Sequence, residues 1–337
     1  MPITQTNQRV NINDRRVING KDADVVQLYP MKHTFAWDAY LTGNTNHWLP
    51  TEIGMQIDVE QWKSNNVLTE DERRAFKTVL GFFTTADSLA ANNLVLATYK
   101  HITSPEIRMY LLRQAYEEAI HTHAYQYIVE SLGLDSSEIF TMYREVESIY
   151  NKASFFVSFN DGIFDPNFKT GTFASDQKFL ENLCVFSLIV EGIFFYSSFA
   201  VVFGLQRQNK MPGSSEQIQY IMRDESNHLN FGADMINAIK QEQPELWTPE
   251  FQSHITNLIK EAVGLEYEFA ITCFPKGIMG ISQDGFRRYI EYIADRRLQR
   301  VGLPVVYGTE NPFPWMSEAV DLAKEKNFFE TRVIEYQ

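Results

Sequence analysis

Residues 116–125 read Tyr116-Glu117-Glu118-Ala119-Ile120-His121-Thr122-His123-Ala124-Tyr125 and contain a Glu-x-x-His pair, Glu118 and His121. A second pair, Glu225 and His228, lies in Arg223-Asp224-Glu225-Ser226-Asn227-His228. On a helix, residues three positions apart lie on nearly the same face. Each pair can therefore offer one carboxylate and one imidazole to the same metal ion.

Two single carboxylates extend this pattern to four helices. Asp87 lies in Thr84-Thr85-Ala86-Asp87-Ser88, and Glu191 lies in Ile189-Val190-Glu191-Gly192. A helical bundle with a dinuclear carboxylate site takes one Glu-x-x-His from each of two helices and one carboxylate from each of two others. The chain has these donors in the order Asp87, Glu118 and His121, Glu191, Glu225 and His228, which suits two long helical hairpins.

The donor types indicate which metals fit. Four carboxylates and two imidazoles suit two iron or manganese ions, because zinc sites use fewer ligands and magnesium or calcium sites seldom use two imidazoles. A single Glu-x-x-His would more simply be a solvated helix face, but two pairs in this order, with apolar neighbours such as Ile120 and Ile189, predict a buried site. We expect His123 to be a hydrogen-bonded helix residue rather than a ligand, and Glu117 to be structural or exposed.

Composition excludes several classes of partner. The chain has 337 residues, 44% of them hydrophobic, and a net charge of -13 at pH 7. It therefore lacks the basic character that nucleic acid or an anionic membrane surface requires, and we expect neither as a partner. Two cysteines, Cys184 and Cys273, cannot form a disulfide framework, and the first 30 residues contain no apolar signal-peptide core. We expect a cytoplasmic protein.

Residues 183–205 are apolar enough to need a membrane test. Their only charged side chain is Glu191, and the length would span a bilayer. An ionised carboxylate there would be costly, and no basic cluster flanks the segment. A helix that is apolar all round also suits the core of a large bundle, in which Glu191 would need a cation. We therefore expect a buried core helix and no membrane span.

The pattern along the chain predicts an all-α fold, a ferritin-like bundle of about eight long helices around the dinuclear site. Helices are expected at about 70–99, opened by the capping box Thr69-x-x-Glu72, and from Pro105 to Gly133. Others are expected in part of 31–52, after 135–138, and over about 176–204, 249–273 and 284–300, with one capped by Ser214-x-x-Gln217. We divide the chain into an N-terminal arm (1–30), the dimetal domain (31–310) and an irregular C-terminal segment (311–337).

Tyr125 shares the ligand face of its helix, about 6 Å beyond His121 along the axis. It suits a one-electron donor to an oxidised dimetal centre, although an ordinary core tyrosine is the simpler alternative. Phe195 and Phe199 follow Glu191 at helical spacing and, with Ile221, could screen a phenoxyl radical from water. The simpler alternative for these three is again core packing.

Together these residues resemble the radical-generating small subunit of class I ribonucleotide reductase, over nearly the whole chain. The resemblance implies that the metals, with molecular oxygen or a reduced oxygen species, oxidise Tyr125 to a stable radical. It also implies a homodimer and a large catalytic subunit, which receives the radical and reduces ribonucleotides to deoxyribonucleotides. Trp48 matches the family's tryptophan near the site, Asp224 the aspartate between it and His121, and Tyr336 the tail tyrosine that passes the radical between subunits.

One departure bears on the cofactor. The body of the chain is most similar to the chlamydial branch, in which phenylalanine replaces the radical tyrosine, glutamate replaces the first aspartate and the cofactor is manganese–iron. Here Tyr125 and Asp87 stand at those positions. The resemblance therefore favours a di-iron cofactor with a tyrosyl radical. The alternatives are Mn/Fe, with the oxidising equivalent stored on the metals, and Mn/Mn.

Two other functions use a similar fold. A self-contained oxidase that binds a fatty ligand predicts an open apolar channel at the metals. An iron-storage bundle predicts a shorter chain that assembles into shells. Trp48, Asp224 and Tyr336 together favour the radical-generating subunit.

Overall fold

The regular structure that the computed structural model describes is helical. It covers residues 11–21, 28–160, 162–275 and 281–316, and no β-strand is found within them, although Ile18 and Ile102 form an isolated bridge. The all-α prediction is thus confirmed for the described residues. The α-helices are α1 (Thr34–Thr45), α2 (Gln56–Lys63), α3 (Glu70–Asn92), α4 (Pro105–Leu132), α5 (Ser136–Glu145), α6 (Glu147–Asn160), α7 (Phe173–Cys184), α8 (Phe195–Gln206), α9 (Pro212–Glu242), α10 (Pro249–Cys273) and α11 (Gln283–Arg300).

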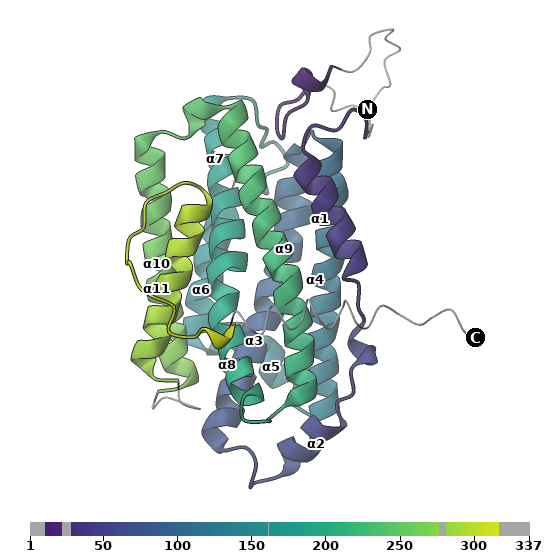
Figure 1. The fold of residues 1–337 in the computed structure, drawn as a ribbon, viewed down its shortest axis with the longest axis vertical. Coiled ribbons are helices and arrows are strands. Elements are labelled where there is room, and N and C mark those ends of the chain that lie inside the picture. Colours follow the sequence, from purple (N-terminus) through teal and green to yellow (C-terminus); the bar gives the residue numbers. More distant parts are fainter. Residues whose placement is uncertain (1–10, 22–27, 161, 276–280, 317–337) are drawn as a thin grey trace, which may run out of the picture.

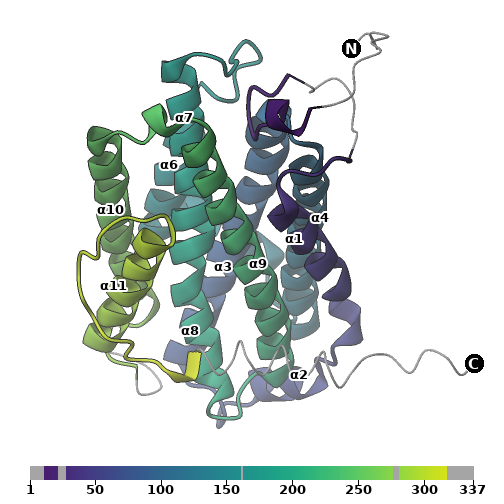
Figure 2. The same ribbon diagram turned by 45° about the horizontal axis from the view of Figure 1, so that its top comes forward.

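The helices that carry the candidate ligands lie side by side along the long axis of the molecule. Figures 1 and 2 show α3, α4, α9 and the α7–α8 helix in the centre, with α10 and α11 on one flank and α1 on the other. α7 and α8 are joined without a break by a π-helical segment, Val185–Phe194, and a second π-helical segment, Asn93–Thr98, extends α3. Helices α2 and α6 are additions to the eight that the sequence predicted.

Several helix ends follow the local sequence signals. Thr69 caps α3, because its hydroxyl accepts from the Glu72 amide while the Glu72 carboxylate accepts from the Thr69 amide, at 3.2 and 2.8 Å. Helix α4 ends at Gly133, whose φ of 65° is the left-handed conformation that glycine adopts without steric cost. Each of these two local signals lies within four residues of the helix end that it determines.

The start of α9 corrects one expectation. The helix does not begin at a Ser214 cap; it begins at Pro212, after Met211 in the left-handed conformation. The amides of Gly213 and Ser214 instead donate to the two carboxylate oxygens of Asp58, at 2.8 and 2.7 Å. Asp58 belongs to α2, so the cap comes from a distant segment and no local pattern could indicate it.

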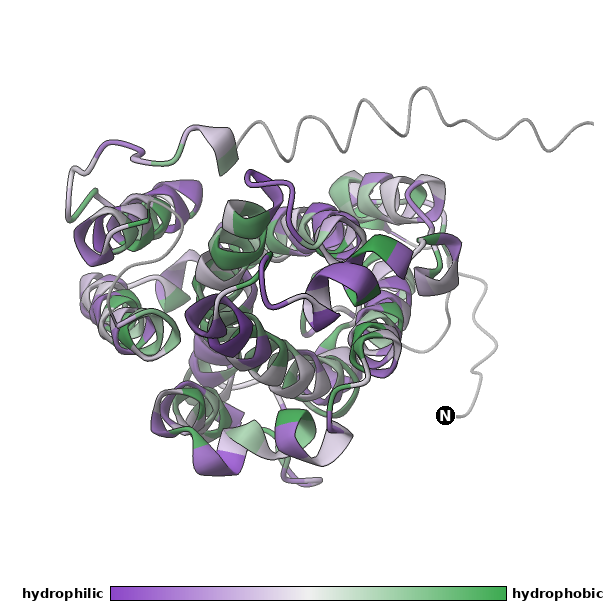
Figure 3. Cartoon of the chain, turned by 90° about the horizontal axis from the view of Figure 1, so that it is seen from below, coloured by the Kyte–Doolittle hydropathy of each residue, from purple (hydrophilic) through white to green (hydrophobic). Residues whose placement is uncertain are grey.

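The core contains the apolar stretch that resembled a membrane span. The helix Phe173–Gln206 is long and apolar enough to cross a bilayer, but the whole of its most apolar 18-residue window is buried inside the protein. Figure 3, which views the bundle from below, shows apolar residues on the sides where the helices face one another. The burial agrees with the expectation of a core helix. The predicted divisions at residues 30 and 310 stay predictions.

Candidate metal centre

The bundle brings six side chains from four helical segments to one place. Asp87, Glu118, His121 and Glu225 offer ligand atoms that all lie within 4.8 Å of one another, and so do Glu118, Glu191, Glu225 and His228. We call these the first and the second ligand group. All six side chains are buried. Glu118 and Glu225 belong to both groups.

These two shared carboxylates each face both imidazoles. In Glu118, one oxygen is 3.7 Å from Nδ1 of His121 and the other is 3.4 Å from Nδ1 of His228. In Glu225, the corresponding distances are 3.1 and 3.3 Å. Two carboxylates that each direct one oxygen to either group are suited to bridge a pair of ions. Asp87 and Glu191 then complete one group each.

The unpaired atoms of the site fit such a pair. Both oxygens of Asp87, Glu118 and Glu225, one oxygen of Glu191 and Nδ1 of both histidines are buried without a hydrogen-bond partner in the described residues. Buried carboxylates without partners are costly, because ionised groups lose their hydration. Four carboxylates would balance two divalent cations, so the donors fit a dinuclear centre in number, charge and type.

The electrostatics of the ion-free site indicate the same need for positive charge. Burial, followed by the neighbouring Glu118, raises the pKa of Asp87 well above its ordinary value, and burial also raises that of Glu191. Burial alone would lower the pKa of His121, but the neighbouring carboxylates of Asp224, Glu118 and Glu225 outweigh burial and raise it. Without metal, protons thus occupy a site that is arranged for cations.

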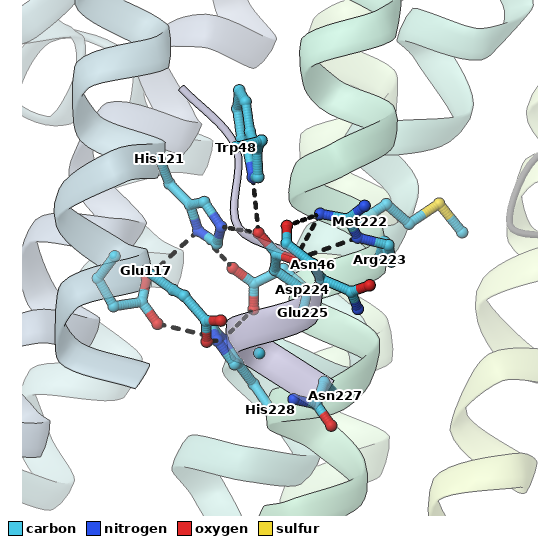
Figure 4. A network of polar contacts seen from close by, with 12 residues as sticks. Asn46, Trp48, Glu117, His121, Met222, Arg223, Asp224, Glu225, Asn227 and His228 are labelled. Atoms are coloured by element: carbon cyan, nitrogen blue, oxygen red, sulfur yellow. Dashed lines mark hydrogen bonds and ion pairs between the residues drawn. The ribbon is translucent and has the colours of Figure 1, made fainter. Parts of the chain in front are cut away.

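The outer nitrogen of His121 leads to Asp224 and Trp48 (Figure 4). Nε2 of His121 lies 3.4 Å from Oδ2 of Asp224, and the Trp48 indole donates to the same oxygen at 2.8 Å. The other Asp224 oxygen accepts from Arg223 at 3.3 Å, and Arg223 also donates to the Asn46 carbonyl. The structure therefore brings the three predicted residues into one chain of contacts.

Glu117 lies behind His228 as Asp224 lies behind His121. The sequence did not indicate this role of Glu117. Glu117, expected to be structural or exposed, is buried, and its Oε2 lies 2.8 Å from Nε2 of His228. Its other oxygen accepts from Arg113 at 3.0 Å. A carboxylate behind a ligating histidine fixes the tautomer and the ring orientation. The one signal in the sequence was Arg113, four residues before Glu117.

Gln114 is a second residue that the sequence did not indicate. Its amide donates to Oε1 of Glu191 at 2.6 Å, while Oε2 of Glu191 has no hydrogen-bond partner in the described residues. One carboxylate oxygen of Glu191 is thus hydrogen-bonded to Gln114, and the other is available to bind an ion. His123, in contrast, is exposed on α4 and belongs to neither ligand group, and its imidazole makes no hydrogen bond within the described residues.

Tyr125 is fully buried beside the first ligand group. Its hydroxyl has no hydrogen-bond partner of ordinary geometry in the described residues. Burial, followed by the neighbouring Asp87, raises its pKa well above the ordinary value, so the phenol keeps its proton. The Phe83 ring stacks on Tyr125, with ring centroids 5.3 Å apart and an interplanar angle of 3°.

The predicted aromatic wall contacts Tyr125 through Phe83. Phe195 and Phe199 lie 5.9 and 5.5 Å from the Phe83 ring, and 6.1 Å from each other. Ile221 is fully buried on α9. Phe83 was not among the predicted residues, although it lies four positions before Asp87, on the same side of α3.

Comparison with known proteins identifies the family. The model of the family "Ribonucleotide reductase, small chain" matches residues 25–312. The chain belongs to this family. It is 53% identical to the ribonucleoside-diphosphate reductase subunit beta of Chlamydia pneumoniae, over 98% of this chain and 95% of the relative. It is 30% identical to the ribonucleoside-diphosphate reductase small chain of Nicotiana tabacum, over 92% and 88% of the two chains.

A solved small subunit has the same fold. The ribonucleotide reductase R2 subunit from Clostridium botulinum matches with a TM-score of 0.83 and 28% identity, over 91% of this chain and 94% of that one. The ferritin-like fold and the dinuclear carboxylate–histidine site are therefore those of a ribonucleotide reductase small chain. Tyr336, the predicted tail residue, lies outside the described residues.

Proposed function

We propose that this chain is the radical-generating small subunit of a class I ribonucleoside-diphosphate reductase, with Tyr125 as the residue that is oxidised. The observation that carries the proposal is a buried tyrosine next to two carboxylate–histidine groups that share Glu118 and Glu225. The names of the relatives support the reaction class. Ribonucleotides would be reduced on a separate large subunit.

The six predicted ligands would hold two metal ions, one in each ligand group. When bound, such ions supply the oxidising power for Tyr125, with oxygen or a reduced oxygen species as oxidant. We propose a di-iron centre, because Tyr125 and Asp87 are present. Mn/Fe and Mn/Mn are the alternatives to this assignment.

Oxidation of Tyr125 to a neutral radical removes one electron and one proton. The Asp87 carboxylate, which belongs to the first ligand group, lies beside the hydroxyl and would accept the proton, while the electron would pass to the oxidised metal centre. Burial of the phenol and its contacts with Phe83 exclude water, which would otherwise reach and quench the radical. Phe195, Phe199 and Ile221, all buried, would extend this wall.

Transfer of the radical toward a partner would use the contacts behind His121. Asp224 accepts from the Trp48 indole and faces Nε2 of His121, which gives an unbroken polar path from a predicted ligand to an aromatic ring. Tyr336 is proposed as the further step toward the large subunit. We also propose that the chain forms a homodimer and works in the cytoplasm.

The cavities weigh against a self-contained oxidase. An apolar cavity of about 730 Å³ lies between α3, α4, α5 and α6, lined by residues such as Leu89, Phe140 and Tyr143. None of the six predicted ligands lines it. An oxidase with a fatty ligand needs an apolar channel that ends at the metals.

The test is electron paramagnetic resonance of the protein after loading with ferrous iron and exposure to oxygen. We expect a tyrosyl signal that is absent from Tyr125→Phe, with two irons bound in both proteins. No radical despite two bound irons would contradict the di-iron assignment, and a signal restored by manganese with iron would point to Mn/Fe. Full turnover of Tyr125→Phe with the large subunit would contradict the role of Tyr125.

A further inference from the structure

The ligand Glu191 sits in an unusually wound stretch of helix. Residues Val185–Phe194 form a π-helical segment, and every one of them is buried. A π-helix pairs each amide with the carbonyl five residues earlier, whereas the following α8 uses the carbonyl four residues earlier. Where the pairing changes, one carbonyl is skipped and loses its amide donor. A buried carbonyl in that position needs another partner.

The side chain of Arg297 supplies such a partner next to Glu191. Its Nε donates to the carbonyl of Gly192 at 2.7 Å, and its guanidinium lies over the Tyr196 ring at 4.6 Å from the centroid. Arg297 is buried and forms no ion pair with a carboxylate in the described part of the chain. Burial of a guanidinium without a counter-ion is costly. The position of Arg297 next to the Gly192 carbonyl therefore requires an explanation.

Gly192 is suited to this contact by its lack of a side chain. A Cβ at this position would lie 3.1 Å from Nε of Arg297 and 3.1 Å from Cδ1 of Leu229. The absence of a Cβ lets the guanidinium approach the carbonyl of the residue that follows Glu191. A second cation holds the end of the same segment, since Lys152 Nζ donates to the Phe194 carbonyl at 3.2 Å.

We propose that Arg297 is a positioning residue for Glu191: by binding the Gly192 carbonyl, it holds the π-helical turn in the register that directs Glu191 into the second ligand group. The inference rests on the metal site of the proposed function. Relaxation of the turn to α-helical pairing would shift the register by one residue, which rotates Glu191 by about 100° around the helix axis.

The experiment is a titration of the metal-free full chain with Mn(II), followed by electron paramagnetic resonance. Two coupled Mn(II) ions and one isolated Mn(II) ion give distinct spectra, so the readout does not depend on turnover. We expect Arg297→Gln to keep one tight ion and to bind the second at least about tenfold more weakly, as is usual when an outer partner of a ligand is lost. At low Mn(II) its spectrum should match that of Glu191→Ala.

The control is Arg296→Gln, which removes the same charge from the neighbouring, exposed position of α11 and should titrate like the unaltered chain. Arg297→Lys retains a donor and should recover part of the second affinity. Gly192→Ala disturbs the same hydrogen bond from its other side and should repeat the selective loss, which covers the case of an unfolded Arg297→Gln protein.

Three outcomes would overturn the inference. Unchanged binding of both ions by Arg297→Gln would show that the Gly192 contact does not position Glu191. An equal loss from both ligand groups would assign Arg297 a general packing role. Failure of the unaltered chain to bind two ions would instead refute the metal site itself, and the inference with it.

Discussion

A buried ion pair outside the metal centre gives a strong test of the core. Lys152 of α6 and Glu266 of α10 are both fully buried, with Nζ 2.6 Å from the carboxylate. The ammonium also lies 3.4 Å from the centroid of the Phe82 ring and 4.0 Å from that of Phe269. Lys152→Met keeps much of the apolar stem but removes the charge, which leaves Glu266 buried without its partner.

The magnitude follows from that loss. Removal of one partner of a buried pair costs about 3–5 kcal/mol, so we expect the free energy of unfolding to fall by about 4 kcal/mol near neutral pH. Lys152→Met with Glu266→Gln should recover most of this loss, because no buried charge remains. As a control, Lys77→Met removes a lysine whose pair with Glu138, at 2.8 Å, is partly exposed to solvent, and should cost no more than about 1 kcal/mol.

The pH dependence has a definite sign. Burial raises the pKa of Glu266 to about 7, although Lys152 lowers it in part. Between the ordinary carboxyl pKa and this raised value, the native protein holds a proton that the unfolded chain has lost, so stability falls as the pH rises. Without Lys152 the pKa rises further, and the fall continues above pH 7. The deficit of the variant should therefore be about 1.4 kcal/mol larger at pH 8 than at pH 6.

Urea unfolding of the metal-free proteins at pH 6 and pH 8 measures both effects. A deficit below about 1 kcal/mol, or the same deficit at both pH values, would refute the view that Lys152 compensates an ionisable carboxyl in the core.

Two further predictions concern the centre itself. Glu117→Gln removes the carboxylate behind His228 and should weaken binding of the ion in the second ligand group by about 10- to 100-fold, as measured by Mn(II) titration; unchanged affinity would mean that Glu117 does not orient the imidazole. Phe83→Ala opens the face of Tyr125 and should shorten the half-life of the tyrosyl radical severalfold, with Phe83→Leu closer to the unaltered protein. Decay of the resonance signal measures this, and equal half-lives would exclude screening by Phe83.

The ligands could be predicted from the sequence because their spacing is a local property of helices. Glu118 and His121, and likewise Glu225 and His228, share a helix face whatever packs against it. The capping box at Thr69 and the glycine end of α4 are local in the same way. Such signals predicted the all-α class and the order of the helices that carry the ligands. They also predicted a metal site, because four buried carboxylates require cations.

The residues that the sequence did not indicate act across helices. Glu117 matters because His228 lies on another helix, and Asp58 matters because α9 begins next to α2. The role of Phe83 could not be predicted without knowing that α3 and α4 pack with the ring faces of Phe83 and Tyr125 together. In each case the side chain looks ordinary in its own segment, and only the partner gives it a role.

The winding around Glu191 is a feature that the sequence did not indicate. Phe195 and Phe199 follow Glu191 by four and eight residues, and placing them on its face by that count assumes an α-helix. The segment that carries Glu191 is π-helical up to Phe194, so its side chains turn by a smaller angle per residue than the count assumes. Both rings contact Phe83, and Phe83 contacts Tyr125. Periodicity alone cannot indicate such a change of winding, which in this chain coincides with a buried cation, Arg297, at the carbonyl of Gly192.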